Sequence, residues 1–358
     1  MNVLWALLFI VFIFSFLSRY IALFNVGPGG TSQHSKPNKL LIFLVLCSLV
    51  LVSGLRNNIG DTYFYMHEYE TQSFTWNNVM EKKDPGFAIL QMLLKNVTDD
   101  PQLLLLVTAL VTNLLIVLTL YKYTKMIELS IFVFIASGMF VVSMNGIRQY
   151  LAASIIFWAT KYLVEGKFKH YFFLVLFSST FHESALILIP IYFIVRREAW
   201  TKVTYLLLFV SICIVLGFNQ FSQILFTAIE DTQYGGYKNF AEGGANIMRV
   251  LVDSIPILVA YFGRHKLRSI WPKSDIIVNM SIIGLLFMII ATQNWIFARF
   301  NIYFSLYNLI LISYIIYLFK ENNRRFVYYG LLVCYVMYFY YEQVISLNLD
   351  YNSEFLQL

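Results

Sequence analysis

The chain alternates between long apolar runs and short polar connections, and this pattern predicts a bundle of membrane-spanning helices. A helix needs about 20 mostly apolar residues to cross the hydrocarbon core of a bilayer. The candidate spans are residues 3–24, 39–55, 101–121, 128–144, 147–164, 203–218, 248–263, 276–292, 299–319 and 326–341. We therefore expect an all-α polytopic membrane protein with about ten full transmembrane helices.

Segment 170–195 is ambiguous, because two apolar runs meet there at His182, Glu183 and Ser184. As one helix it would extend about 39 Å at 1.5 Å per residue, which is long for a hydrocarbon core of about 30 Å. As two half-helices, each piece would reach about 18 Å and would be too short to cross. An ionisable group at membrane depth marks a functional site by default, so His182 is the first candidate site residue.

Loop charges decide between these possibilities, because cytoplasmic loops are rich in Lys and Arg. With the N-terminus outside, the early basic groups fall inside: Arg19, Lys36, Lys39, Lys122, Lys125, Lys161, Lys167 and Lys169. A single crossing of 170–195 would move the later basic groups outside, whereas a re-entrant or broken helix pair keeps them inside. These later groups are Arg196, Arg197, Lys202, Arg264, Lys266, Arg268, Lys273, Lys320, Arg324 and Arg325. We therefore expect a broken pair at 170–195, with His182 at its tip and facing outside.

The composition agrees with a multi-pass protein of the cell membrane. The chain is 59% hydrophobic and 13% charged, whereas soluble domains are about one quarter charged. The net charge of +6 fits basic cytoplasmic loops and does not indicate a nucleic-acid partner. The cysteines lie inside apolar runs, and the N-terminus lacks a basic n-region and a cleavage site, so we expect a retained first span.

We find no sign of a soluble domain, so the chain is expected to be a single integral-membrane domain over residues 1–358. Two long extracellular loops are expected, at 56–100 and at 219–247. The second is rich in Gly, Asn and Tyr, which suits a mobile loop over a site.

Under this topology, polar groups gather at the outer membrane boundary. They are Arg56 and Asp61 after one span, Asn145, Arg148 and Gln149 at the start of another, His182 and Glu183 at the tip, and Arg299 and Asn301 at a further span start. Arginines are unusual on the outer side, and guanidinium groups match phosphate oxygens. Asn145, Arg148 and Gln149 are spaced i, i+3, i+4, so we expect one helix face that points donors at an anion.

The sugar-binding side of this site is expected on the same boundary. If the segment after Asp61 is helical, Asp61, Tyr65, Glu68 and Tyr69 form one polar and aromatic stripe that could hold sugar hydroxyls and rings. There is no Asp-x-Asp pair and no Gly-rich nucleotide loop, so we expect no metal and no cofactor. A lipid-linked sugar donor reached from outside is the consistent choice.

Simpler roles remain open for each of these residues. The arginines Arg56, Arg148 and Arg299 could anchor span ends at lipid headgroups. His182 could be a satisfied polar group within the bundle, and Asp61 could be the N-cap of a short surface helix.

The chain resembles the EpsG family of exopolysaccharide polymerases, a Wzy-like group from Gram-positive bacteria that make biofilm polysaccharide. The stretches that carry the resemblance run in the family's order and span about residues 40 to 320. They are Gly54-Leu55-Arg56 with Gly60-Asp61-Thr62, Asp84-Pro85-Gly86-Phe87, Asn145-Gly146-Ile147-Arg148-Gln149-Tyr150, Phe181-His182-Glu183-Ser184-Ala185, and Ile296-Phe297-Ala298-Arg299-Phe300-Asn301-Ile302-Tyr303. Glu183 stands where a serine is more usual, so no role is assigned to it.

The resemblance implies a metal-independent glycosyltransferase that polymerises repeat units at the outer face of the membrane. Its donor would be a saccharide on undecaprenyl pyrophosphate and its acceptor a lipid-linked repeat unit, with membrane lipids and other assembly proteins, such as a flippase or a chain-length regulator, as further partners. His182 would be the general base, because histidine titrates near neutral pH. Arg148 and Arg299 would stabilise the pyrophosphate, helped by Arg56. Among the substrate-binding residues, Asp61 would orient the acceptor or share the proton of His182, and Asn145, Gln149 and Asn301 would bind substrate.

Other functions stay open at this point. A ligase that transfers a finished glycan to a different acceptor would use the same arginines and histidine. A flippase or exporter of lipid-linked saccharide, which is not an enzyme, should expose charges along an inward-facing cavity as well. An acid transporter with His182 in a proton relay is a further alternative, although few carboxylates lie within the candidate spans.

Overall fold

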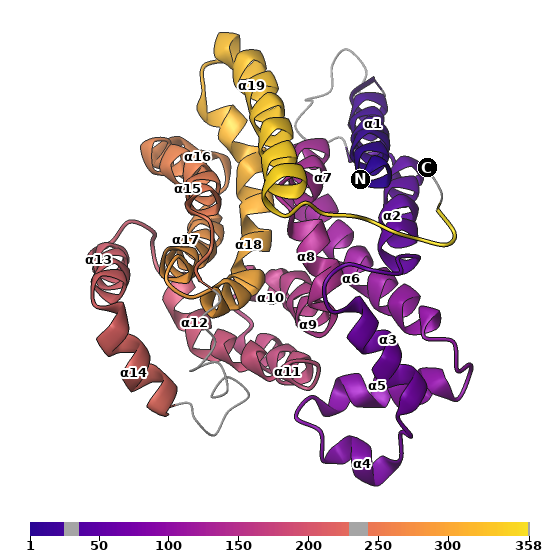
Figure 1. Ribbon diagram of the computed structural model, residues 1–358. Helices are drawn as coiled ribbons and strands as arrows, with labels where there is room; N and C mark the ends of the chain where they lie inside the picture. The colour runs from indigo at the N-terminus through magenta and orange to yellow at the C-terminus, as the bar shows by residue number, and fades with distance from the viewer. Residues whose placement is uncertain (25–35, 229–242, 357–358) are drawn as a thin grey trace. The chain divides into compact units, whose positions relative to one another are not determined.

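The computed structural model describes residues 1–24, 36–228 and 243–356. These residues form helices and their connections, with no strand among them (Figure 1). They divide into two compact units: unit 1 comprises Met1–Ile189 and Ile312–Leu358, and unit 2 comprises Pro190–Leu311. Each unit is described by itself.

Unit 1 contains the residues around His182 and most of the other predicted site positions. Its helices are α1 (Asn2–Phe24), α2 (Lys39–Gly54), α3 (Thr62–Thr71), α4 (Trp76–Met80), α5 (Pro85–Lys95), α6 (Gln102–Tyr123), α7 (Ile127–Ala136), α8 (Met139–Asn145), α9 (Ile147–Trp158), α10 (Thr160–Glu165), α11 (Phe168–Ser179), η1 (Glu183–Ile187), α19 (Glu321–Phe339) and the π-helix η4 (Tyr340–Ser346). Helix α2 packs between α1 and α6, and α6 also packs against α9.

Unit 2 contains α13 (Lys202–Leu216), α14 (Phe218–Ala228), α15 (Ile247–Phe262), α16 (Arg264–Ile270) and α17 (Ser274–Ala291). Helix α17 packs against both α13 and α15. Two helices contain residues of both units: α12 (Leu188–Val195) and α18 (Ile296–Ile315). Helix α18 continues into the short 3-10 helix η3 (Ile316–Leu318).

The helices are those of a multi-pass membrane protein, but fewer are long spans than the hydropathy pattern predicts. Within the described residues, four helices are long and apolar enough to cross a membrane: Asn2–Ala22, Gln102–Tyr123, Ser274–Ala291 and Ile296–Leu318. The number rises to 6 if each of two bent pairs is one span, α7 with α8 (56°) and α13 with α14 (97°). Among the described residues, fewer helices are long and apolar enough to cross a membrane than the expected number of about ten.

The difference arises because several predicted spans are short or broken. The run 39–55 becomes the short apolar helix α2, and 147–164 is divided between α9 and α10. Hydropathy reports how apolar a stretch is and contains no signal for where its backbone changes direction. The expected interruption near His182 is present, since α11 ends at Ser179 and η1 begins at Glu183.

The two segments expected to be long extracellular loops contain helices. Segment 56–100 forms α3, α4 and α5, which lie together in unit 1 (Figure 1). Tyr65, Tyr69 and Phe87 from α3 and α5 are buried against Leu104 and Leu105 of α6 in one apolar cluster. The segment 219–247 begins within α14, and its residues 229–242 lie outside the described part of the chain.

Candidate active site

His182 lies in the connection between two helices that pack on each other. After α11 ends at Ser179, the backbone becomes extended at His182 (φ −158°, ψ 115°) and then enters η1. The His182 side chain is buried, with 7% of its residue surface exposed. Its Nδ1 lies 2.7 Å from the hydroxyl oxygen of Ser184, so the serine fixes the orientation of the ring. We call residues 180–184 the His182 turn.

The carboxylate of Asp84 joins the His182 turn to Arg148. Asp84 Oδ1 accepts a hydrogen bond from the backbone N–H of Glu183 at 3.2 Å, and Oδ2 lies 2.9 Å from Arg148 Nη1. Only 4% of Asp84 is exposed. Burial raises the pKa of the Asp84 carboxyl, against the lowering effects of Arg148 and of the Glu183 N–H. A buried carboxylate therefore contacts both a cation and the turn that contains the histidine.

Arg148 stands at the second position of α9, where a helix break sets its direction. Helix α8 ends at Asn145 and α9 begins at Ile147, with Gly146 between them. The Arg148 side chain remains 42% exposed, and its guanidinium carbon lies 5.8 Å from the centre of the Tyr65 ring. One edge of the guanidinium is thus held by Asp84, while much of the side chain can still be reached by a ligand.

The expected single helix face of Asn145, Arg148 and Gln149 is interrupted by the break at Gly146. Asn145 belongs to α8 and is exposed, whereas Gln149 is buried in α9. The side-chain oxygen of Asn145 accepts a hydrogen bond from the backbone N–H of Asp61 at 2.9 Å. The spacing rule assumes one continuous helix, so it fails where the helix is broken.

Asp61 occupies the N-cap position of α3, but its side chain makes no capping hydrogen bond. The aromatic stripe expected beside it is mostly packing, because Tyr65 and Tyr69 are buried in the cluster with Phe87. The remaining member, Glu68, binds Lys82 at 2.7 Å. Of the two carboxylates in the stripe, that of Glu68 is paired with Lys82, whereas that of Asp61 does not cap its helix.

Arg56 is enclosed by the protein. Only 1% of it is exposed, and its nitrogens donate to three acceptors: Nε to Thr62 Oγ1 at 2.9 Å, Nη2 to the Met144 carbonyl at 2.7 Å, and Nη1 to the Ser53 carbonyl. Burial lowers the pKa of Arg56 to about 10, so the guanidinium stays charged at neutral pH.

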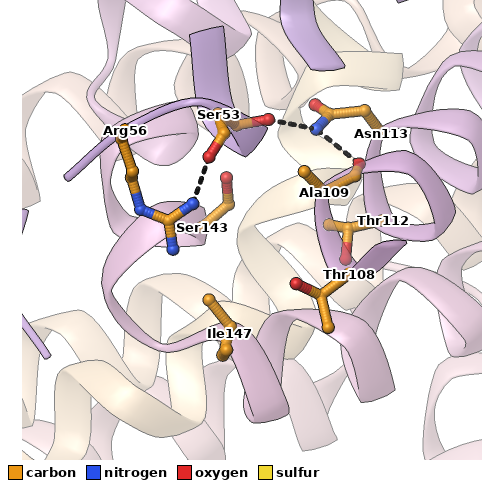
Figure 2. Close-up of a pocket in the computed structure, with 8 residues that line it drawn as sticks. All are labelled: Ser53, Arg56, Thr108, Ala109, Thr112, Asn113, Ser143 and Ile147. Atoms are coloured by element: carbon orange, nitrogen blue, oxygen red, sulfur yellow. Dashed lines mark hydrogen bonds between the residues drawn. The ribbon is translucent and has the colours of Figure 1, made fainter. Parts of the chain in front are cut away.

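A small polar cavity lies beside Arg56 (Figure 2). It is lined by Ser53, Arg56, Thr108, Ala109, Thr112, Asn113, Ser143 and Ile147, and about 10 Å³ of it can hold the centre of a water molecule. The hydroxyl of Ser53 accepts a hydrogen bond from the Asn113 amide at 3.1 Å, which extends the polar contacts from Arg56 into α6. This space fits about one water molecule and no pyrophosphate.

The remaining two predicted residues, Arg299 and Asn301, belong to unit 2 and lie on α18. The guanidinium carbon of Arg299 lies 4.6 Å from the centre of the Trp295 ring, a cation–π contact. Asn301 is buried, and its amide donates to Asp253 Oδ2 of α15 at 3.5 Å. Since residues two apart in a helix point in very different directions, Arg299 and Asn301 face different surroundings.

The donors and acceptors in unit 1 can support acid–base and anion chemistry. An oriented imidazole at His182 can move a proton, and the partly exposed guanidinium of Arg148 can neutralise an oxyanion. Across the described ranges, no group of three or more His, Cys, Asp or Glu side chains is arranged to hold a metal ion.

The comparison with known families decides the identity at the level of the family. The model of the EpsG family matches residues 39–356, which is nearly the whole chain. The chain belongs to the EpsG family. This family is exopolysaccharide-polymerase-like, and its membership agrees with the apolar helices of a multi-pass membrane protein. No curated protein and no solved structure matches the chain.

Three residues of this EpsG-family chain escaped the sequence reasoning. Asp84 stands in a motif that carries the family resemblance, but an Asp before Pro-Gly is typical of a helix start. Ser184 belongs to the histidine motif, and its contact with the ring follows from the extended backbone at His182. Asp253 is a carboxylate within a predicted span, which is itself a signal for a polar contact inside a bundle.

Proposed function

We propose that this EpsG-family protein is a polymerase-type glycosyltransferase that joins undecaprenyl-pyrophosphate-linked repeat units at the outer face of the cell membrane. The donor would be a saccharide chain on the lipid pyrophosphate, and the acceptor a lipid-linked repeat unit. One observation supports this most: Asp84 contacts both Arg148 and the backbone of Glu183, so a cation and an oriented histidine turn are held by one carboxylate. A base for a hydroxyl and a cation for a pyrophosphate are the two needs of this transfer.

His182 is assigned as the general base. In the tautomer whose Nδ1–H donates to the Ser184 hydroxyl, the other ring nitrogen, Nε2, would accept the proton of the acceptor hydroxyl. As that oxygen forms its bond to the anomeric carbon of the donor, the bond from this carbon to the pyrophosphate oxygen breaks. The lipid pyrophosphate then leaves with the electron pair, and the proton stays on the imidazole until it is passed to solvent or to the leaving group.

Arg148 of unit 1 is assigned to the pyrophosphate, and Arg299 of unit 2 keeps, as a separate assignment, its predicted role toward phosphate oxygens. Charge develops on the leaving oxygen as the glycosidic bond to the lipid breaks, and a positioned guanidinium stabilises it. Asp84 and Tyr65 restrict the orientation of the Arg148 plane, which favours bidentate contact with phosphate oxygens. Trp295 restricts Arg299 in the same way within unit 2.

Most of the residues expected to bind substrate receive a different role in this proposal. Arg56, Asn145 and Asn301 are used in contacts within the protein, so we assign them to positioning. Gln149 is buried at the start of α9 and is assigned to the same role. Asp61 keeps the role of orienting the acceptor, because its carboxylate does not cap α3.

The proposal includes a membrane topology. The four long spans, the two bent pairs and the two shorter apolar helices α2 and η1–α12 would all lie in the membrane, with 170–195 as a re-entrant or twice-crossing pair. His182 and Arg148 would then face outside. Single cysteines at 182 and 148, in a chain lacking Cys47, Cys213 and Cys334, should react in intact cells with a membrane-impermeant thiol reagent. A cysteine at 197 should be protected, and its labelling from outside would contradict the topology.

The function is tested with purified protein in liposomes that contain a lipid-linked repeat unit. We expect wild type to produce a ladder of lengthening lipid-linked chains, and His182→Ala and Arg148→Ala to produce none while remaining in the membrane. His170→Ala and Arg325→Ala, which remove the same side chains elsewhere, are the matched controls. A single transfer to a different acceptor would indicate a ligase, and movement of the lipid across the bilayer without a new glycosidic bond would indicate a flippase. Either result would overturn the proposal.

A further inference from the structure

We infer that Asp84 is a positioning residue that holds Arg148 and the His182 turn in one arrangement. Its two carboxylate oxygens have separate partners, with Oδ2 on the Arg148 guanidinium at 2.9 Å and Oδ1 on the Glu183 N–H at 3.2 Å. The consequence for turnover rests on the proposed function, whereas the consequence for the His182 turn follows from the contacts alone.

The local sequence makes Asp84 available for this purpose. Asp84 is at the N-cap of α5, but its backbone (φ −113°, ψ 70°) does not direct the side chain to its own helix, and it makes no capping hydrogen bond. Pro85 at the first helical position has no N–H to satisfy. The N–H of Gly86, one of the groups that an N-cap side chain would accept from, donates to the Thr180 carbonyl instead, and the Asp84 carboxylate contacts Arg148 and Glu183.

The start of α5 contacts the His182 turn at a second point. The backbone N–H of Gly86 donates to the Thr180 carbonyl at 2.8 Å. A β-carbon at Gly86 would lie 2.2 Å from Thr180 Oγ1, so only glycine permits this approach. The peptide after His182 and the carbonyl of Thr180, two residues before it, are thus both bound by the segment Asp84-Pro85-Gly86.

The charge of Asp84 matters for one of its two contacts. An asparagine at this position could still accept from Glu183 N–H through its amide oxygen, but its amide nitrogen would face the donor groups of Arg148. An alanine would lose both contacts. Asp84→Asn therefore removes the contact that orients Arg148 and keeps the one that stabilises the His182 turn, whereas Asp84→Ala removes both contacts.

The first measurement is hydrogen–deuterium exchange of the Glu183 amide in the full-length protein in liposomes. We expect Asp84→Ala to raise the exchange rate about tenfold, which corresponds to the loss of one hydrogen bond, and Asp84→Asn to leave it near wild type. This readout does not depend on any catalytic activity. An unchanged rate in Asp84→Ala would overturn the inference.

The second measurement is the rate of chain extension in the same liposomes. Both variants should have a kcat about 100-fold lower than wild type, because a displaced Arg148 no longer meets the developing charge, while KM should change by less than about tenfold. Asp99→Asn, which changes a carboxylate that is 89% exposed, controls for the loss of one negative charge and should keep the wild-type rate.

The outcomes separate the two claims. Wild-type kcat in Asp84→Asn would overturn the positioning of Arg148. If wild type itself extends no chain, the proposed function fails, and the exchange of the Glu183 amide still decides whether Asp84 holds the turn.

Discussion

Arg56 Nη2 donates to the carbonyl oxygen of Met144 at 2.7 Å, across 88 positions of sequence. The next residue, Asn145, accepts a hydrogen bond from Asp61 N–H at 2.9 Å. The loop between α2 and α3 is therefore tied twice to the end of α8, just before the break that starts α9 and directs Arg148. Arg56, which was expected to bind substrate, instead binds the backbone at Met144, close to the helix break that orients Arg148.

Arg56→Lys should destabilise the protein, since an ammonium on a flexible stem cannot serve three acceptors in one plane. Hydrogen bonds from charged donors contribute about 1.5–3 kcal/mol each, so we expect a loss of about 2–4 kcal/mol. Thermal unfolding in detergent measures it. Arg325→Lys, at an exposed position of α19, is the control and should change the midpoint little. Equal midpoints for Arg56→Lys and wild type would contradict the structural role.

Gly60→Ala should also disturb this connection. Gly60 has φ +53°, and a β-carbon there would lie 2.1 Å from the side-chain oxygen of Asn145. The left-handed backbone alone costs about 1–2 kcal/mol with a side chain. Because the clash involves Asn145, Gly60→Ala combined with Asn145→Gly should be less damaging than the sum of both changes, by about 0.5–3 kcal/mol.

Unfolding midpoints of the two single variants and the double variant give this coupling energy. Gly330→Ala is the matched control, because a β-carbon at Gly330 meets nothing within 4 Å. If the effects of the two single changes simply add, the backbone conformation at Gly60 does not depend on Asn145.

The C-terminal residues 350–354 form a strap over the same loop. Asn352 donates from its backbone to Asn58 Oδ1 at 2.8 Å, and the Asn352 carbonyl accepts from Asn57 N–H at 2.9 Å. The hydroxyl of the buried Tyr351 donates to the Val52 carbonyl at 2.8 Å. The strap therefore covers the segment that contains Arg56.

Truncation after Leu349 should loosen this loop and reduce polymer formation while the protein still reaches the membrane. Tyr351→Phe, which removes one buried hydroxyl, should cost about 1–2 kcal/mol. Limited proteolysis between α2 and α3, together with unfolding midpoints, measures both effects. Phe355→Ala changes an exposed side chain and is the control. Unchanged proteolysis in the truncated protein would show that the strap does not hold the loop.

The sequence predicted the helical membrane class and the interruption at His182, because apolar runs and isolated ionisable groups are strong local signals. It did not predict that Arg56 would be buried. An arginine at the end of an apolar run reads as a headgroup anchor, and its real acceptors at Thr62 and Met144 are set by tertiary packing.

Asp84 was missed for a related reason. Its immediate neighbours, Pro85 and Gly86, are typical of a helix start, which accounts for an aspartate without any distant partner. Only the fold brings it to Arg148, 64 positions later in the chain. The helix face expected for Asn145, Arg148 and Gln149 failed because residue spacing contains no sign of the break at Gly146.

The pH dependence of stability should single out Asp84. Its carboxyl is buried against Arg148 and Glu183, with Lys83 adjacent, and burial raises its pKa above the ordinary 3.8. For an acid whose folded pKa is raised, the stabilising contribution is complete below the unfolded pKa and is lost as the pH rises through the folded pKa. At neutral pH the ionised Asp84 therefore lowers the stability of the fold, as buried ion pairs can.

Asp84→Asn should accordingly be as stable as wild type or more stable at pH 7, and this advantage should shrink as the pH falls toward about 4. The rate of chain extension by wild type should fall as the pH falls, since protonation of Asp84 releases Arg148. Unfolding midpoints and extension rates of both proteins across this pH range test the two signs together. Asp99→Asn controls for the loss of one negative charge. A stability advantage that grows on acidification would mean that the Asp84 carboxylate stabilises the fold, and that its contact with Arg148 is structural.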